Sequence, residues 1–300
     1  MQTTSKVLMV RPSHFAFNEE TAQNNCFQQR GAHENVHKEA ITQFDSLVSA
    51  LRANDVDVIV VQDTSEPWTP DSIFPNNWFS SHISGELVLY PMFAKNRQAE
   101  RKPEILKLLR RKMNHPKLVD LTHWEAKGLF LEGTGSMILD RDKNIAYACR
   151  SERTSEEVLN DFCNKMGFDA VVFDAYDKVG NPIYHTNVMM EVGTQVAIIC
   201  LESIKSEVER NRVVSRLTET GKVIVDISLD QVEHFAGNML EVKSRNRNPI
   251  MVMSASARKS LTAEQEQVIA TYNKIVSVDL STIESNGGGS ARCMIAEIFY

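Results

Sequence analysis

The chain has 300 residues, of which 42% are hydrophobic and 24% are charged, and this is the composition of an ordinary globular protein. Its net charge of −6 and its pI of about 5.8 argue against nucleic acid or an anionic membrane as a partner. No apolar run approaches the ~20 residues of a membrane-spanning helix, no signal-peptide pattern precedes the first apolar run, and the 5 cysteines have the odd number and scattered spacing of reduced thiols. We therefore expect a cytoplasmic protein.

The N-terminal part of the chain combines a strand, a helix and a strand with a long polar insertion. Apolar runs and helical spacing predict a strand over 7–10, a helix over 36–53 and a strand over 58–61. The polar residues 13–35 form a connection long enough to be a lid or a binding loop, and a plain surface excursion is the alternative. Phe15 lies in this segment and is expected to contact a ligand.

Beyond residue 75 a unit of two strands, a helix and a third strand recurs, roughly every 50–55 residues. The predicted strands lie at 78–79, 87–90, 118–121, 136–139, 145–149, 170–173, 188–191, 195–200, 223–227, 239–242, 250–253 and 276–280, and the predicted helices at 100–113, 155–166, 206–218 and 262–275. A terminal strand after Cys293 supplies what the first unit lacks, so five units would close into a ring. No linker divides the chain, and we predict a single domain over residues 1–300.

Residues that can carry chemistry stand at the strand openings of successive units. They are Asn76-Asn77, Glu132-Gly133, His185-Thr186-Asn187, Gly237-Asn238 and the segment from Gly289 to Cys293. Equivalent positions of a closed ring face one central channel, so the repeat gathers a thiol, an imidazole, a carboxylate and several amides in one pocket. Each of these residues taken alone is more often structural, and the functional interpretation depends on their occurrence together.

The segment before Cys293 has two features that favour a reactive cysteine over a buried core cysteine. Gly287, Gly288 and Gly289 let the backbone come close to a ligand, which a core strand does not need. Arg292 places a positive charge beside the thiol, and the thiolate is the nucleophilic form of cysteine.

Several short motifs occur in the order in which a known superfamily has them. They are Arg11-Pro12, Pro70-Asp71-Ser72-Ile73-Phe74, Leu131-Glu132-Gly133, Ser151-Glu152-Arg153-Thr154, His185 and the glycine-rich segment at Cys293. In these motifs, over nearly its whole length, the chain resembles the guanidine-modifying, or pentein, superfamily of arginine deiminases, dimethylarginine dimethylaminohydrolases and amidinotransferases. The stretches 74–78, 132–136 and 288–294 resemble the citrulline utilisation hydrolase, or citrulline ureidase, subgroup most. The resemblance implies a five-bladed α/β propeller of ββαβ units with pseudo-fivefold symmetry.

The resemblance also implies a catalytic set. Cys293 matches the nucleophile that forms a covalent adduct with the guanidino or ureido carbon. His185 matches the general acid and base, and Glu132 matches the carboxylate that orients His185 or the substrate nitrogens.

The implied substrate-binding set lies in other units of the ring. Asp71 matches an acidic position before the second unit, and Arg153 matches an arginine that binds the substrate's α-carboxylate. Arg101 or Arg97 would supply the second cation for this carboxylate, because an arginine pair suits a planar carboxylate.

Two amides bear on the choice of substrate. Deiminases bind the cationic guanidinium with carboxylates at two positions that align here with Asn77 and Asn187. Burying a cation without a counter-charge costs several kcal/mol, whereas amides can pair with the oxygen and the N–H groups of a neutral ureido group. We therefore predict hydrolysis of citrulline to ornithine, carbon dioxide and ammonia through a covalent cysteine adduct.

Three alternatives remain at this point. The first is an arginine deiminase or a dimethylarginine hydrolase that holds guanidinium with Asp71 and Glu132 alone, the second is an amidinotransferase, and the third is a non-catalytic pentein that binds a macromolecule. We expect a small-molecule amino acid as ligand, no nucleic acid, no membrane and no cofactor, and a homodimer is one assembly that the sequence allows. His33 and His37 lack a cysteine or acidic partner at metal-site spacing, so no metal site is expected.

Overall fold

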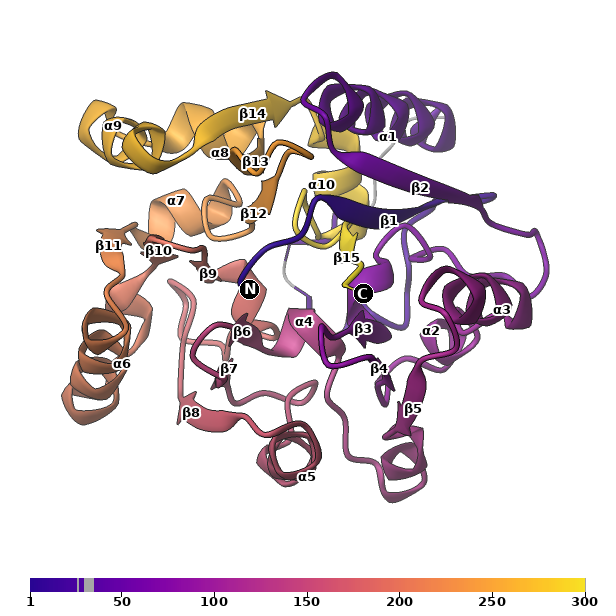
Figure 1. Cartoon of the computed structure of the whole chain (residues 1–300), viewed down its shortest axis with the longest axis horizontal. Coiled ribbons are helices and arrows are strands. Elements are labelled where there is room, and N and C mark those ends of the chain that lie inside the picture. The colour runs from indigo at the N-terminus through magenta and orange to yellow at the C-terminus, as the bar shows by residue number, and fades with distance from the viewer. Residues whose placement is uncertain (26, 30–34, 300) are drawn as a thin grey trace.

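Five small β-sheets surround a common centre in the computed structural model, which describes residues 1–25, 27–29 and 35–299 (Figure 1). The strands are β1 (Lys6–Arg11), β2 (Asp57–Gln62), β3 (Phe79–Ser81), β4 (Glu86–Leu89), β5 (Lys117–Asp120), β6 (Ile138–Asp140), β7 (Ile145–Cys149), β8 (Asp169–Phe173), β9 (Met190–Val192), β10 (Val196–Ile199), β11 (Val223–Asp226), β12 (Leu240–Lys243), β13 (Pro249–Ser254), β14 (Lys274–Val278) and β15 (Ala296–Glu297). The sheet orders are β15-β1-β2, β3-β4-β5, β6-β7-β8, β9-β10-β11 and β12-β13-β14.

In every sheet the middle strand is antiparallel to the inner strand and parallel to the outer strand. Parallel neighbours need a crossover connection, and helices provide it. The helices are α1 (Val36–Ala53), α2 (Lys95–Gln98), α3 (Pro103–Lys112), α4 (Gly133–Ser136), α5 (Glu156–Met166), α6 (Glu207–Glu219), α7 (Leu229–Glu233), α8 (Ala255–Ser260), α9 (Ala263–Tyr272) and α10 (Ser281–Gly287), with 3-10 turns η1 (Pro75–Asn77), η2 (Thr122–Lys127), η3 (Thr186–Val188) and η4 (Leu201–Ser203). This repeated ββαβ unit confirms the predicted five-bladed α/β propeller.

The C-terminal strand closes the ring. β15 pairs with β1 in antiparallel register, with Val7 opposite Glu297 and Leu8 opposite Ala296. The first unit is therefore completed by the end of the chain, as the repeat predicted. That residues 1–300 form one domain stays a prediction.

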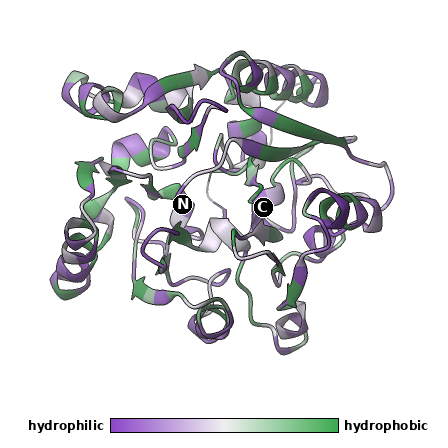
Figure 2. Ribbon diagram, in the orientation of Figure 1, coloured by the Kyte–Doolittle hydropathy of each residue, from purple (hydrophilic) through white to green (hydrophobic). Residues whose placement is uncertain are grey.

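Burial explains why the periodic patterns were readable. The strands β7 and β10 are buried along their whole length, which gives them continuous apolar runs. Helix α1 buries a single apolar stripe of Ala40, Phe44, Leu47, Val48 and Leu51. Figure 2 shows mainly hydrophobic strands and outer helices that mix hydrophobic and hydrophilic residues. No helix of the described ranges combines the length and the apolar character that crossing a bilayer requires.

Two predictions about local structure were wrong. The helix predicted over 262–275 ends at Tyr272, because Lys274–Val278 is a strand whose Ile275 pairs with Met251 of β13. The strands predicted to begin at 78, 136 and 188 begin only after short helical turns that immediately precede β3, β6 and β9. Apolar runs show that a segment is buried, but they do not show where a tight turn ends and extended backbone begins.

Candidate active site

The short turns before the inner strands carry most of the predicted site residues. Asn77 ends η1, Glu132 directly precedes α4, and His185 directly precedes η3. The turns pack closely: a Cβ on Gly133, whose φ is +49°, would lie 2.5 Å from the carbonyl oxygen of Asn76. Glycine is needed at this contact, which brings the second and third units together at the hub.

A small cavity lies where these turns meet. Its wall includes the predicted residues Asp71, Asn77, Arg153, His185 and Cys293, together with Thr21, Asn25, Phe74, Arg97, Tyr184 and the backbone from Gly287 to Gly289. Its volume of about 20 Å³ leaves room for about one water molecule. An open cavity of about 810 Å³ is also lined by Asn25 and Tyr184. The segment that carries Asn25 therefore borders both cavities.

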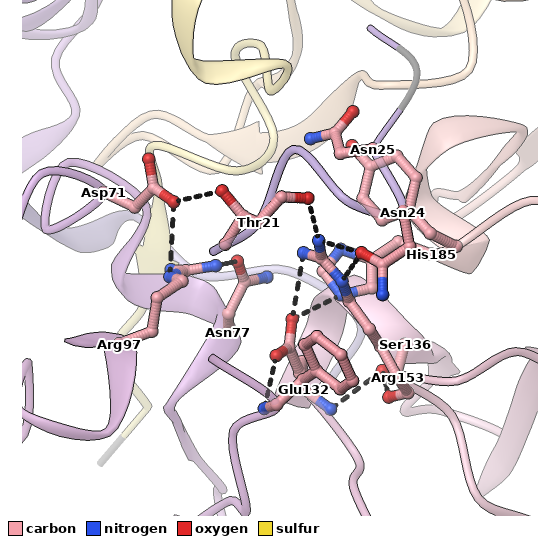
Figure 3. Close-up of polar contacts among 12 residues, drawn as sticks. Thr21, Asn24, Asn25, Asp71, Asn77, Arg97, Glu132, Ser136, Arg153 and His185 are labelled. Atoms are coloured by element: carbon pink, nitrogen blue, oxygen red, sulfur yellow. Dashed lines mark hydrogen bonds and ion pairs between the residues drawn. The ribbon is translucent and has the colours of Figure 1, made fainter. Parts of the chain in front are cut away.

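His185 and Glu132 form a buried pair at the hub (Figure 3). His185 Nε2 lies 2.8 Å from Glu132 Oε2, and Glu132 Oε1 accepts a hydrogen bond from the backbone N–H of Phe93 at 2.9 Å. Burial opposes ionisation of Glu132, but Arg153 and His185 outweigh it and lower the pKa of this carboxyl to about 2. Burial lowers the pKa of His185 to about 4, against the opposing effect of Glu132. At neutral pH the pair is a carboxylate and a neutral imidazole.

The pairing decides which ring nitrogen can exchange a proton. An ionised carboxylate only accepts hydrogen bonds, so His185 Nε2 carries its hydrogen toward Glu132 and Nδ1 keeps its lone pair. Nδ1 and the Asn77 amide both pack against Gly135 and are therefore neighbours. A Cβ on Gly135 would lie 2.8 Å from His185 Nδ1 and 2.4 Å from Asn77 Nδ2. His185 is thus set up to take a proton at Nδ1.

The sulfur of Cys293 faces amides. Asn187 Nδ2 and Asn238 Nδ2 each lie 3.3 Å from Cys293 Sγ, at hydrogen-bond distance. Asn187, which was predicted to bind substrate, thus contacts the predicted nucleophile through its Nδ2. Its Oδ1 is buried without a hydrogen-bond partner in the described part of the chain. Two amide donors favour negative charge on the sulfur without adding a charge of their own.

Arg97 fixes the orientation of the Asn77 amide. Arg97 Nη1 donates to Asn77 Oδ1 at 2.7 Å, and Arg97 Nε pairs with Glu100 Oε1 at 2.8 Å. A guanidinium can only donate, so the contact identifies Oδ1 and leaves Asn77 Nδ2 on the other side, buried and unpaired among the described residues. Asp71 Oδ2 lies 4.0 Å from Arg97 Nε, and burial raises the pKa of Asp71 despite this cation. Its Oδ1 also has no hydrogen-bond partner within the described ranges.

The polar segment after β1 covers the cavity. Asn18 Nδ2 and Thr21 Oγ1 donate to Asp71 Oδ2 at 2.7 and 3.1 Å. Arg153 donates to the carbonyl oxygen of Thr21 at 2.7 Å and, through Nε, to Asn24 Oδ1 at 2.8 Å (Figure 3). These contacts favour a covering segment over a plain surface excursion. The segment predicted as residues 13–35 also includes residues 26 and 30–34, which lie outside the described residues.

The wall of the small cavity does not include four of the predicted residues, which are Glu132, Asn187, Arg101 and Phe15. Glu132 and Asn187 contact His185 and Cys293, which do line it. Arg101 binds Glu125 Oε2 at 3.0 Å and the Tyr90 carbonyl oxygen at 3.2 Å, so of the two alternatives Arg97 is the cation in the cavity wall and Arg101 is not. Both arginines follow Pro91, and only the fold shows which one turns inward. Phe15 is buried in the core, behind Gly287, where a Cβ would lie 3.1 Å from its ring.

Arg292 points away from the sulfur. Its Nη2 binds Glu297 Oε2 and its Nη1 the carbonyl oxygen of Ile295, both at 3.1 Å. It therefore braces the last turn rather than supplying charge to Cys293. Sequence reasoning missed the roles of Thr21 and Asn24, because these residues lie outside the repeat positions. It placed Asn238 at a repeat position but did not show that its amide contacts Cys293. The described residues contain no cluster of three or more His, Cys, Asp or Glu side chains that could hold a metal, and His33 lies outside them.

Comparisons with known proteins agree with this architecture. The family model described as N,N dimethylarginine dimethylhydrolase, eukaryotic, matches residues 11–300. One similar solved structure is the N-terminal domain of ArgZ, a cyanobacterial arginine dihydrolase of the ornithine-ammonia cycle, as a cysteine-to-serine variant with substrate. Its TM-score to this chain is 0.77 at 17% identity, with 98% of each chain covered. AgrE with ornithine and NAD+ has a TM-score of 0.77 at 18% identity, covering 97% of this chain and 39% of AgrE.

A third solved structure, DDAH from Pseudomonas aeruginosa with citrulline, has a TM-score of 0.66 at 16% identity, with 99% of this chain and 100% of that chain covered. The chain spans only 41% of full-length ArgZ. Comparison with curated proteins gives no match. At these identities the solved structures bear on the fold alone.

Proposed function

Because the chain belongs to the N,N dimethylarginine dimethylhydrolase family, and is therefore a hydrolase of the pentein superfamily acting on C–N bonds, we propose that it hydrolyses the ureido group of free citrulline. In this proposal Cys293 is the nucleophile, His185 is the acid and base, and Glu132 orients His185. The proposal builds on three buried polar atoms that have no hydrogen-bond partner among the described residues, and on the two amides that contact the sulfur.

The Asn77 amide is the observation that carries the choice of substrate. Arg97 holds Asn77 Oδ1, so the group left for a ligand is the Nδ2 donor. A ureido carbonyl oxygen accepts this hydrogen bond, whereas every nitrogen of a guanidinium presents N–H and would leave two donors facing each other. Asn187 Oδ1 and Asp71 Oδ1 are acceptors for the ureido N–H groups. The three atoms together match a urea better than a guanidinium.

The proposed reaction needs no external reagent other than water. The Cys293 thiol gives its proton to His185 Nδ1, the sulfur forms a bond to the ureido carbon, and Asn77 Nδ2 stabilises the developing oxyanion. One C–N bond then breaks, and the imidazolium returns the proton to the departing nitrogen. Water activated by His185 then cleaves the C–S bond, which restores the thiol and releases a carbamic acid. The remaining C–N bond of this carbamic acid breaks to give carbon dioxide and the second amine, so citrulline and one water yield ornithine, carbon dioxide and ammonia.

Substrate entry requires the covering segment to move. The cavity of about 20 Å³ cannot hold an amino acid. Arg153 is the proposed ligand of the α-carboxylate, and its donors now point at Thr21 O and Asn24 Oδ1. A carboxylate would replace these neutral acceptors with a charge-assisted pair, and displacement of this segment would join the small cavity to the open one of about 810 Å³.

An arginine or methylarginine hydrolase is the second candidate. The observation in its favour is Asp71, a buried carboxylate in the cavity wall whose Oδ1 has no hydrogen-bond partner in the part of the chain that the structure describes. Arg97 Nε lies 4.0 Å from Asp71 Oδ2, however, so this carboxylate already has a cationic partner. A second cation at the same carboxylate would meet repulsion from Arg97.

A substrate panel tests the proposal. Citrulline, arginine, methylarginines and agmatine are incubated with the purified chain, and ornithine and ammonia are both quantified. We expect kcat/KM for citrulline to exceed that for arginine by about 100-fold, because each mispaired buried donor weakens binding of the transition state. Equal or higher kcat/KM on arginine would contradict the proposal.

Changing Asn77 to aspartate should shift the preference toward arginine. The substitution replaces the donor by an acceptor, so we expect kcat/KM for citrulline to fall about 100-fold and KM for arginine to fall. Asn187→Asp should act in the same direction. The matched control is Asn76→Asp, because Asn76 is equally buried but its amide contacts Thr134. No gain of arginine binding in either site variant would count against the ureido assignment.

The pH dependence of kcat/KM should report the neutral His185. His185 must be unprotonated to accept the thiol proton, and its pKa is lowered to about 4. We expect kcat/KM to stay level as pH falls from 7 to about 5 and to reach half its plateau near pH 4, rather than near the ordinary value of about 6.5. Initial rates in buffers of constant ionic strength measure this, with the fold checked by circular dichroism at each pH. A midpoint near 6.5 would show that His185 is not held neutral by burial.

A further inference from the structure

Asn238 is a buried amide at the hub to which the resemblance assigns no role. It is 1% exposed and lies in the turn just before β12. The preceding residue, Gly237, packs directly against the backbone of Val188. A Cβ on Gly237 would lie 2.3 Å from the carbonyl oxygen of Val188 and would clash, so only glycine lets the chain carry Asn238 this close. The fourth and fifth units therefore approach backbone to backbone, and this approach delivers Asn238 to the nucleophile.

The contacts of Asn238 converge on Cys293. Asn238 Nδ2 is 3.3 Å from Cys293 Sγ and donates to the carbonyl oxygen of Asn187 at 2.9 Å. The sulfur is 3.6 Å from Asn238 Oδ1, within reach of an S–H donor. The backbone N–H of Arg292 also donates to the carbonyl oxygen of Asn238, at 3.4 Å. Asn238 thus links the turn that carries the nucleophile to the turn that carries Asn187.

An amide suits both protonation states of the sulfur. The protonated thiol can donate to Asn238 Oδ1, and the thiolate can accept from Nδ2, so the side chain has a role before and after proton transfer. Together with Asn187 Nδ2, it gives the thiolate two N–H donors without placing a further charge beside the sulfur. A carboxylate at this position would repel the thiolate, and an aliphatic side chain would leave it with one donor.

We propose that Asn238 is a catalytic residue that stabilises the Cys293 thiolate and aims it at the substrate carbon. The proposal deepens and rests on the proposed function, in which Cys293 is the nucleophile. It predicts an effect on the reactivity of the thiol itself, and hence on kcat rather than on substrate binding.

Alkylation of the intact chain by iodoacetamide at pH 7 tests the proposal without any substrate. The rate at Cys293 is followed by peptide mass spectrometry. We expect Asn238→Ala to lower this rate about tenfold, as loss of one hydrogen bond to a charged group would. Asn238→Asp keeps the shape of the side chain and should lower the rate further. In steady-state assays kcat should fall by about 10-fold to 100-fold while KM changes less than threefold.

The matched control is Asn76→Ala. Asn76 is also fully buried at the opening of a repeat unit, and its amide contacts Thr134 rather than the sulfur. We expect this variant to lose thermal stability much as Asn238→Ala does and to keep the wild-type alkylation rate. Alkylation of Cys293 within twofold of wild type in folded Asn238→Ala or Asn238→Asp would overturn the proposal. If the wild type hydrolyses no ureido compound, the proposed function fails, whereas the alkylation rates still decide the role of Asn238.

Discussion

Replacing Cys293 by serine is expected to abolish turnover of citrulline, with kcat lowered by at least about 10⁴-fold. The physical reason is that a hydroxyl ionises far less readily than a thiol, and the two amide donors on Sγ can stabilise an anion only where one can form. Substrate binding should survive, because Asp71, Asn77 and Arg153 are unchanged in the cavity wall. Calorimetry with citrulline measures binding, and quenched samples in the mass spectrometer show whether a covalent adduct accumulates.

The control for this variant is Cys163→Ser. Cys163 is a buried thiol on α5, away from the cavity, and burial raises its pKa to about 12. Its substitution is expected to leave kcat unchanged, and Cys293 should still be labelled by a thiol reagent, as seen by mass spectrometry. Full activity in the Cys293 variant, or an adduct on another cysteine, would refute the assignment of the nucleophile.

Removal of the buried acid–base pair should have the second largest effect. We expect His185→Gln to lower kcat by about 10³-fold to 10⁴-fold and Glu132→Gln by about 10²-fold, since general acid–base catalysis contributes about 10² to 10⁴. Glu132→Gln keeps the side chain's size but removes the charge that holds the proton on His185 Nε2. The two substitutions act on one proton relay, so the double variant should be little worse than His185→Gln alone.

Stopped-flow or coupled assays of ornithine release measure these effects, and Glu125→Gln is the matched control. Glu125 is also a carboxylate that accepts a backbone hydrogen bond and pairs with an arginine, but its partner is Arg101, whereas Glu132 pairs with His185. Its loss should cost stability without lowering kcat. Additive losses in the double variant would mean that Glu132 acts on the substrate rather than through His185.

Much of the architecture was readable because each unit buries its middle strand on both faces. The run Ile145–Cys149 and the helix Val36–Ala53 were predicted with the bounds that the structure shows, since a fully buried strand and a one-sided helix impose strict patterns. The order of these patterns also predicted closure by the last strand. The short turns before β3, β6 and β9 escaped prediction, because their bounds follow from contacts between units rather than from local pattern.

The sequence by itself determined the repeat, and with it the convergence of Cys293, His185 and Asn77 on one cavity, because equivalent positions in a closed ring face the same centre. Only the tertiary structure decided which of two nearby arginines turns inward, that Arg292 braces the backbone instead of the thiol, and that Asn238 contacts the sulfur. The reason is physical: the direction of a side chain and its partners depend on sub-ångström packing between units that are distant in sequence, such as Gly237 against Val188. Periodicity places a residue at the hub, and packing decides what it touches there.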